Sequence, residues 1–160
     1  MNPRSSLALL IVGALAGSAP TVALGQTPRD SVLAVVHRLF DGMRQGDSAM
    51  VRSVFDSSVQ FLSVSERDGV PTAAARSVDA FVAAVGTPHE QVYDERIWDV
   101  ELEVDSGLAS VWAKYAFYLG DTFNHCGVDA FGLVRRAAGW KIVYVADTER
   151  RTGCWRGPGG

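Results

Sequence analysis

Four side chains in the second half of the chain are of the types that acid–base chemistry requires: His125, Tyr118, Asp129 and Asp147. An imidazole titrates near working pH, so the histidine could serve as a general base or acid. The tyrosine could donate a hydrogen bond to a developing oxyanion. Two aspartates facing each other would repel, which raises one pKa or requires a neutralising cation, and Lys114 is the predicted cation. These four residues are the candidate catalytic set.

The same side chains also allow a structural interpretation, which the sequence leaves open. Lys114 and Asp129 would form a cross-strand ion pair, Asp147 would end a strand, and His125 would be a hydrogen-bonded structural residue. Residues four apart on a strand are separated by about 13 Å, so His125 and Asp129 cannot form a direct pair. Any acid–base pair must be made across strands. The ligand-binding candidates, which strand spacing equally assigns to a core, are Trp112, Lys114, Phe131 and Val145.

Three neighbouring strands must position these residues. A loop at 120–123 would pair Tyr118 with His125, Lys114 with Asp129 and Trp112 with Phe131. A three-residue loop ending at Gly139 would pair Asp129 with Asp147, and Phe131 with Val145. Because side chains alternate between the faces of a sheet, all the candidates then share one face, and a one-residue slip in either loop would exchange the faces. The predicted strands are 110–119, 124–136 and 140–147.

Both faces of this sheet carry many apolar residues, so both require a cover. Three helices are predicted ahead of it, beginning at the N-caps Thr27, Asp47 and Ser77. They can cover one face, and a second subunit is expected on the other, which predicts a homodimer. Alternating residues predict a strand from Val59 and another over 98–105, whereas residues 87–96 show no clear period.

The first residues have the layout of a secretory signal peptide. Arg4 precedes an apolar run at 7–16, and a small-x-small cleavage site at 23–25 precedes Gln26. The run is shorter than the roughly 20 residues that span a bilayer. We therefore expect a signal peptide at 1–25, one domain at 26–154, a disordered tail at 155–160, and a secreted or periplasmic protein without a membrane span.

The net charge and the two cysteines limit the partners and cofactors to be expected. Losing Arg4 with the leader changes the net charge from −3 to −4, which argues against nucleic acid as a partner. In an oxidising compartment Cys126 and Cys154 are expected to form one disulfide, the competing interpretation being a thiol nucleophile or a metal ligand. The spacing of His37, His89 and His125 fits no zinc site, and no nucleotide-binding loop is present. We expect no metal and no cofactor.

The order helix, Gly46-Asp47, helix, strand, helix and strands ending in Gly139-Trp140-Lys141-Ile142 resembles the nuclear transport factor 2-like superfamily, also called SnoaL-like or ketosteroid-isomerase-like. The stretch from Tyr118 to Asp129 looks like a secreted bacterial subgroup. The resemblance implies an α+β fold in which three helices of the N-terminal half wrap a cone-shaped, curved, mixed or antiparallel sheet around an apolar pocket. It does not carry over any catalytic residue.

Three functions are compatible with this sequence. The first is an exported domain that binds a small apolar or aromatic molecule. The second is an isomerase, dehydratase or cyclase using His125 with Asp129 or Asp147. The third is a non-catalytic dimeric interaction module. A cavity with the polar groups pointing inward would favour the first two.

Overall fold

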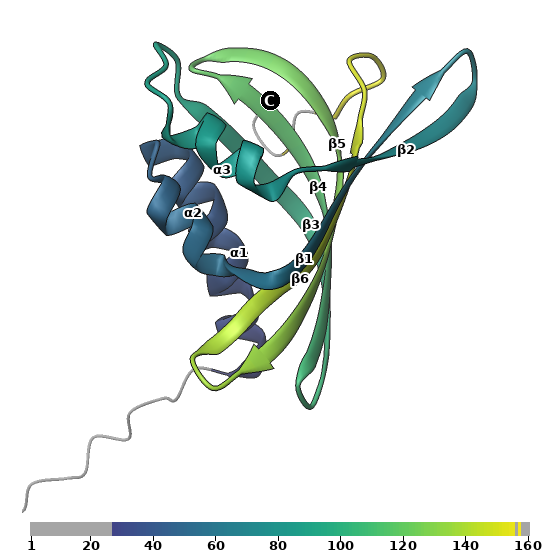
Figure 1. Cartoon of the computed structure of the whole chain (residues 1–160). Coiled ribbons are helices and arrows are strands. Elements are labelled where there is room, and N and C mark those ends of the chain that lie inside the picture. Colours follow the sequence, from purple (N-terminus) through teal and green to yellow (C-terminus); the bar gives the residue numbers. More distant parts are fainter. Residues whose placement is uncertain (1–26, 156, 158–160) are drawn as a thin grey trace, which may run out of the picture.

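Residues 27–155 and residue 157 are described by the computed structural model, which contains three helices and a six-stranded sheet (Figure 1). The helices are α1 (Pro28–Gln45), α2 (Ser48–Val54) and α3 (Val78–Gly86). The strands are β1 (Phe55–Arg67), β2 (Val70–Arg76), β3 (Tyr93–Asp105), β4 (Leu108–Leu119), β5 (Thr122–Arg136) and β6 (Gly139–Glu149). The predicted fold class is confirmed. The predicted leader lies outside the described residues, as do residues 156 and 158–160 of the predicted tail.

The sheet has the order β2-β1-β6-β5-β4-β3, and its neighbours are antiparallel except for the parallel pair β1–β6. It curves around α1, α2 and α3, which all lie on its concave side (Figure 1). The core fills the space between them: Val32, Val36 and Phe40 of α1 are buried, together with Leu133 and Ile142 of the sheet. No helix in the described part of the chain is long and apolar enough to cross a membrane.

All three helices begin where the sequence predicts. Thr27 accepts a hydrogen bond from the backbone N–H of Asp30, whose carboxylate in turn accepts from the Thr27 N–H at 3.1 Å, which completes a capping box. Asp47 and Ser77 cap α2 and α3 in the same position. Gly46 ends α1 at a φ of 64°, a left-handed conformation that favours glycine. Local hydrogen bonds therefore define these boundaries.

The predicted register of the β5–β6 hairpin is confirmed at the candidate residues, which lie away from the turn. Asp129 lies opposite Asp147, and Phe131 lies opposite Val145. The turn itself is one residue shorter than predicted, because Arg136 pairs with Gly139. An irregularity between Gly132 and Leu133 compensates for this shift.

The predicted register of the β4–β5 hairpin is wrong by one residue. Leu119 pairs with Thr122 across a turn that is two residues shorter than predicted, in which Gly120 has a φ of 58°, and an irregularity between Phe117 and Tyr118 reduces the shift to one residue in the rest of the hairpin. Lys114 therefore lies opposite Val128 rather than Asp129, and Trp112 lies opposite Ala130. A one-residue shift moves the side chains of one strand to the other face relative to its neighbour. Trp112 and Lys114 consequently point away from the helices, and Tyr115 takes the inner position.

A bulge in β3 changes which of its residues face the helices. Asp99 has a φ of 49°, and the pairing of β3 with β4 shifts between Trp98 and Glu101. Beyond the bulge the buried residue is Leu102, an even-numbered position. Before it, the residues that pack toward the core are odd-numbered, and Glu95 is one of them. The strand also starts at Tyr93, earlier than predicted.

The predicted disulfide between Cys126 and Cys154 is confirmed, with Cα atoms 5.8 Å apart. It holds the segment that follows β6 against β5, where Cys126 also exchanges backbone hydrogen bonds of 3.0 and 2.9 Å with Arg150. Trp155, the first residue of the predicted tail, lies beneath the side chains of Lys114 and Arg150. A disulfide of this kind is consistent with an extracellular location.

Candidate functional site

A cavity of about 80 Å³, here called the inner cavity, lies between the helices and the concave face of the sheet. Its apolar lining comes from α1 (Leu39, Phe40 and Met43), α3 (Phe81) and the sheet (Phe55, Phe61, Phe131 and Val145). Its polar lining is Glu95, Tyr115, His125, Asp129 and Asp147. An apolar cavity with a few converging polar groups is the usual form of a small-molecule site.

Three strands bring three carboxyl groups into this cavity. Asp129 of β5 and Asp147 of β6 face each other across the hairpin, and Glu95 approaches from β3. Asp129 is only 4% exposed. The side chains of Glu95 and Asp129 form a hydrogen bond, for which one of the two carboxyl groups must be protonated.

Burial sets the protonation of this group. Burial raises the pKa of Glu95 to about 7. The hydrogen bond from Asp129 lowers this pKa, because it favours the charged glutamate, but its effect is smaller than that of burial. Burial, together with the nearby Glu95 carboxylate, raises the pKa of Asp129 well above its usual value. Asp129 is thus the proton donor and Glu95 the acceptor. The pKa of Asp147 is also raised, mainly by burial, although Ser63 donates a hydrogen bond to it at 3.2 Å.

Two oxygens of the cluster lack donors. Oδ2 of Asp129 and Oδ1 of Asp147 are buried and meet no hydrogen-bond donor among the described residues. Leaving such an atom unpaired costs on the order of 1–3 kcal/mol. Their position in the wall of a cavity means that a ligand could supply the missing donors.

His125 occupies the end of the cavity next to Tyr115 and Phe117. Its ring lies edge-on to Tyr115 at 5.6 Å between centroids, and its Nδ1 is 2.8 Å from the side-chain oxygen of Asn124. Burial lowers the pKa of this imidazole, against the opposing effect of Glu149. His125 is therefore neutral at pH 7.

Five of the residues predicted from the sequence lie together in the inner cavity: His125, Asp129, Asp147, Phe131 and Val145. The other three lie elsewhere.

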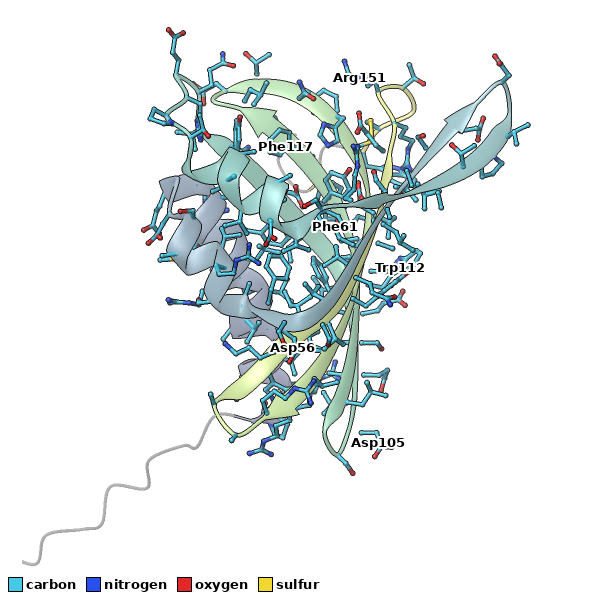
Figure 2. All side chains as sticks on the ribbon, viewed as in Figure 1. Asp56, Phe61, Asp105, Trp112, Phe117 and Arg151 are labelled. Carbon is cyan, nitrogen blue, oxygen red and sulfur yellow. A yellow bond between two sulfur atoms is a disulfide. The ribbon has the colours of Figure 1, made fainter. Side chains whose placement is uncertain are left out.

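Trp112 is 51% exposed on the convex face, on the far side of the sheet from Phe61 (Figure 2). Lys114 forms an ion pair with Asp99 at 2.7 Å, so the predicted cluster of Lys114 with the two aspartates does not form. Tyr118 is packed against Phe123 and lies under the guanidinium of Arg96. The predicted Tyr118–His125 pair is wrong for the same reason as the register, since Phe117 lies opposite His125.

Two residues of the cavity, Glu95 and Tyr115, were not singled out from the sequence. The signal for Glu95 is present, because Tyr93 and Ile97 alternate around it as inward-facing residues do on a strand. Tyr115 was assigned to the other face by the one-residue register error. Its hydroxyl donates to the carbonyl oxygen of Thr148 at 2.9 Å, and burial raises its pKa, so it stays protonated.

A second hollow of about 460 Å³, here called the outer cleft, adjoins the inner cavity. The two share Phe61, Phe81 and Asp147 in their walls. Phe61 and Phe81 meet edge to face at 5.7 Å between ring centroids. Arg76 and Glu149 lie in the cleft wall. These two rings and Asp147 therefore form the boundary between the cleft and the inner cavity.

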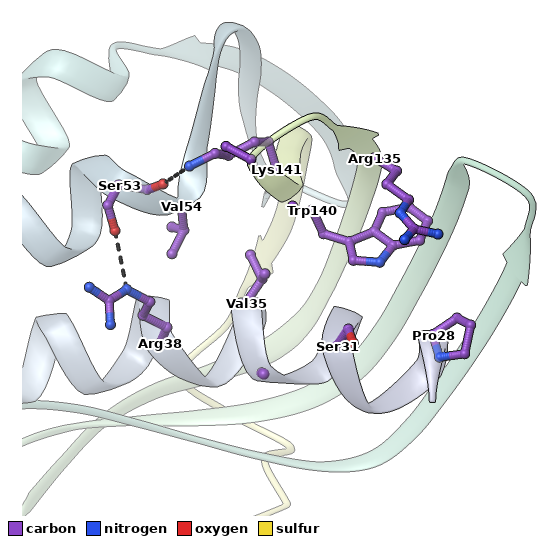
Figure 3. Close-up of a pocket in the computed structure, with 12 residues that line it drawn as sticks. Pro28, Ser31, Val35, Arg38, Ser53, Val54, Arg135, Trp140 and Lys141 are labelled. Atoms are coloured by element: carbon purple, nitrogen blue, oxygen red, sulfur yellow. Dashed lines mark hydrogen bonds between the residues drawn. The ribbon is translucent and has the colours of Figure 1, made fainter. Parts of the chain in front are cut away.

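A third hollow, the basic groove, lies between α1, α2 and the β5–β6 turn and also has a volume of about 460 Å³ (Figure 3). Its cations are Arg38, Arg135 and Lys141. Two of them are already bound within the chain, since Arg38 donates to the Ser53 hydroxyl at 3.2 Å and Lys141 donates to the Ser53 carbonyl (Figure 3). The inner cavity, with its unpaired buried oxygens, is the better candidate site.

No group of three His, Cys, Asp or Glu side chains in residues 27–155 or 157 is arranged to hold a metal ion. Glu95, Asp129 and Asp147 of the inner cavity do not form such a group either.

A family model described as "Putative lumazine-binding" matches residues 27–146, which is most of the chain. The chain belongs to this family. Among curated proteins none matches it significantly. The fold is that of the nuclear transport factor 2-like superfamily, as the solved structures similar to this family member show.

One such structure is a nuclear transport factor 2-like protein with a cystatin-like fold from Novosphingobium aromaticivorans, with TM-score 0.61, 13% identity, and 79% of this chain and 84% of that chain covered. Another is a "putative dehydratase" from Streptomyces avermitilis, with TM-score 0.59, 15% identity, and 77% and 96% covered. A "putative ketosteroid isomerase" from Shewanella frigidimarina has TM-score 0.54, 16% identity, and 75% and 96% covered. At these identities the likeness shows the fold.

The stability of this family member is expected to fall as the pH rises from 4.5 to 7. The folded state holds a proton on Glu95 until about pH 7, whereas the unfolded chain loses it near 4.5. At about 1.4 kcal/mol per pKa unit, the loss in unfolding free energy is up to about 3 kcal/mol. The variant Glu95→Gln has no such proton. Urea denaturation measures the unfolding free energy of both proteins at pH 5 and at pH 7.5. Between these pH values, the unfolding free energy of Glu95→Gln relative to that of the wild type should rise by about 2–3 kcal/mol.

Glu101→Gln is the matched control, because Glu101 is an exposed glutamate further along the same strand. It should follow the wild type at both pH values. Comparing variants removes the opposite contribution of His125, whose lowered pKa destabilises the folded state as the pH falls. Parallel pH profiles for Glu95→Gln and the wild type would contradict the assignment.

Proposed function

We propose that the chain is a small-molecule-binding domain that holds the polar end of an apolar or aromatic ligand in the inner cavity. The observation that carries the proposal is the pair of buried carboxyl oxygens, on Asp129 and Asp147, that have no donor among the described residues. Buried polar groups in folded proteins are nearly always paired. A ligand that donates hydrogen bonds to these oxygens would remove their cost.

The size of the cavity defines how such a ligand is placed. A water molecule takes about 30 Å³, so 80 Å³ accepts only the polar end of a ligand and a few further atoms. The remainder would extend between Phe61 and Phe81 into the outer cleft. Aromatic rings on this path favour a flat or apolar body.

The proposal is tested by NMR titration with benzyl alcohol and with lumazine, the compound that the family description names. Methyl groups of Leu39 and Val145 report on the inner cavity, and those of the exposed Leu108 serve as the control. Binding should shift the first two and leave Leu108 unchanged. The variant Val145→Phe should weaken binding by filling the cavity, whereas Val70→Phe, at an exposed position of β2, should not. Cavity methyls that respond to neither compound would contradict the proposal.

A second candidate function is acid–base catalysis, favoured by the Glu95–Asp129 pair. A base with a pKa of about 7 lies one hydrogen bond from a carboxyl that keeps its proton. The proposed catalytic set keeps His125, Asp129 and Asp147 and adds Glu95, while Tyr118 lies outside the cavity. The test is deuterium incorporation from D₂O next to the carbonyl of cyclohexanone. Catalysed exchange should fall roughly 10²–10⁴-fold in Glu95→Gln, and exchange at the uncatalysed rate would refute this candidate.

The homodimer and the exported location also stay proposals. The convex face exposes Leu108 and Trp112, which supports a partner there. Light scattering should give twice the mass of one chain, and Trp112→Glu should halve it. A mass of one chain for the wild type would contradict the dimer.

N-terminal sequencing of the exported protein should begin at Gln26.

A further inference from the structure

We propose that the inner cavity selects ligands whose buried end is an ammonium group, on the grounds that it presents three carboxyl groups and that its lining, within the described residues, contains no Lys or Arg. The inference rests on the proposed binding function and names the chemical class of the ligand. Asp129 supports it independently, since its side chain is nine-tenths buried and its Oδ2 has no donor among the described residues.

Most of the cations near the cavity form ion pairs with other groups, and Arg76 is the exception. Arg44 and Arg96 both pair with Asp94, at 3.3 and 2.7 Å. Lys114 pairs with Asp99 on the other side of the sheet. Arg76 faces Asp147 from the outer cleft and lowers its pKa, but this only partly offsets burial. Within the described part of the chain, no ion pair therefore involves Glu95, Asp129 or Asp147, and only Arg76 acts on one of them from a distance.

The geometry suits an ammonium group better than a metal ion. An ammonium carries three N–H donors, which match the unpaired oxygens of Asp129 and Asp147 and the carboxylate of Glu95. The cavity wall also contains the rings of Phe40, Phe61 and Tyr115, and aromatic faces attract cations. A metal ion would need converging ligands, and the described residues provide no such group.

Binding of a cation must be coupled to the protons of the cluster. Without a ligand, protons on Asp129 and, below pH 7, on Glu95 limit the repulsion between the three carboxyl groups. An ammonium group favours the ionised forms, so it should displace protons as it binds. The titratable groups around the pair are Asp94, Tyr115, His125 and Asp147 and, through Asp147, Arg76 and Glu149. Affinity should therefore rise between pH 5 and pH 8.

The test compares isosteres that differ in charge: benzylamine, benzyl alcohol and benzoate, with methylamine as an amine small enough for the inner cavity alone. Calorimetry at pH 7.5, in two buffers of different ionisation enthalpy, measures affinity and proton release together. Benzylamine should bind about tenfold tighter than benzyl alcohol or more, as expected for hydrogen bonds to charged groups, and should release protons. Benzoate should bind most weakly.

Asp129→Asn keeps the shape of the side chain and removes its charge. It should weaken benzylamine about tenfold and abolish most of the proton release, but weaken benzyl alcohol much less, because the amide oxygen of asparagine still accepts a hydrogen bond. Circular dichroism shows whether the variant is folded. Glu101→Gln is the control and should match the wild type. Benzyl alcohol binding as tightly as benzylamine would overturn the inference and leave the proposed function standing. Binding of none of the four compounds would overturn both.

Discussion

Replacing Gly127 by alanine is expected to destabilise the protein by about 4 kcal/mol or more, the range of the most severe single substitutions. A methyl group at this position would lie 1.7 Å from the carbonyl oxygen of Thr148 and 2.7 Å from a ring carbon of Tyr115. The contact with the carbonyl is a contact with backbone, which no side-chain rotation can relieve. The neighbouring strands would have to separate.

The backbone around Gly127 is held too firmly for that. The Thr148 carbonyl accepts the Tyr115 hydroxyl at 2.9 Å, and the Thr148 hydroxyl accepts the N–H of Val128 at 3.0 Å. On the other side Cys126 is bonded to Arg150 and to Cys154. Any shift of β6 would break several of these interactions at once, which is why the cost is expected to be large.

Chemical denaturation monitored by tryptophan fluorescence provides the measurement. Gly107→Ala is the matched control, since a methyl group there would come no closer than 3.8 Å to Arg135, an ordinary contact. The control should lose less than about 1 kcal/mol. A Gly127→Ala protein as stable as Gly107→Ala would show that β6 can move away from β5 at little cost.

Removing the disulfide is expected to lower the unfolding free energy by about 3 kcal/mol. The bond links residues 28 apart, and closing a loop of that length restricts the unfolded chain by roughly this amount in the chain-entropy model. The double variant Cys126→Ala/Cys154→Ala avoids leaving a buried free thiol. The lost bond also frees the segment that follows β6, including Trp155.

A reducing agent offers an internal control for this prediction. It should lower the thermal midpoint of the wild type toward that of the double variant and leave the variant unaffected. Equal midpoints for wild type and variant under oxidising conditions would mean that the loop is held by its other contacts. The backbone hydrogen bonds between Cys126 and Arg150 are the contacts that would then be responsible.

The helices were predictable because their signals are local. The side chains of Thr27, Asp47 and Ser77 each bond to a backbone N–H three residues away, so a short stretch of sequence contains both partners. The end of α1 is also set by a single residue, because Gly46 adopts the left-handed conformation that ends the helix. The disulfide followed from having two cysteines and an expected oxidising compartment.

The candidate site was only partly predictable, because its composition depends on single-residue irregularities. Asp129, Asp147, Phe131 and Val145 come together since the irregularity at Gly132 restores the expected register of one hairpin. In the other hairpin, the irregularity between Phe117 and Tyr118 leaves a net shift of one residue, which puts Trp112 and Lys114 on the convex face and Tyr115 inside. Glu95 alternates with Tyr93 and Ile97, but the bulge at Asp99 puts these residues out of phase with Leu102, so the alternation of residues 98–105 does not extend to them.

The parallel pairing of β1 with β6 has a consequence for how the chain is made. β1 ends at Arg67, yet one of its two neighbours, β6, begins only at Gly139. During synthesis the first strand must therefore wait for more than half of the remaining chain before this edge can close. Pairings so distant in sequence slow folding. A chain released before Gly139 would leave β1 open along that edge, with the hydrophobic core uncovered and available for aggregation.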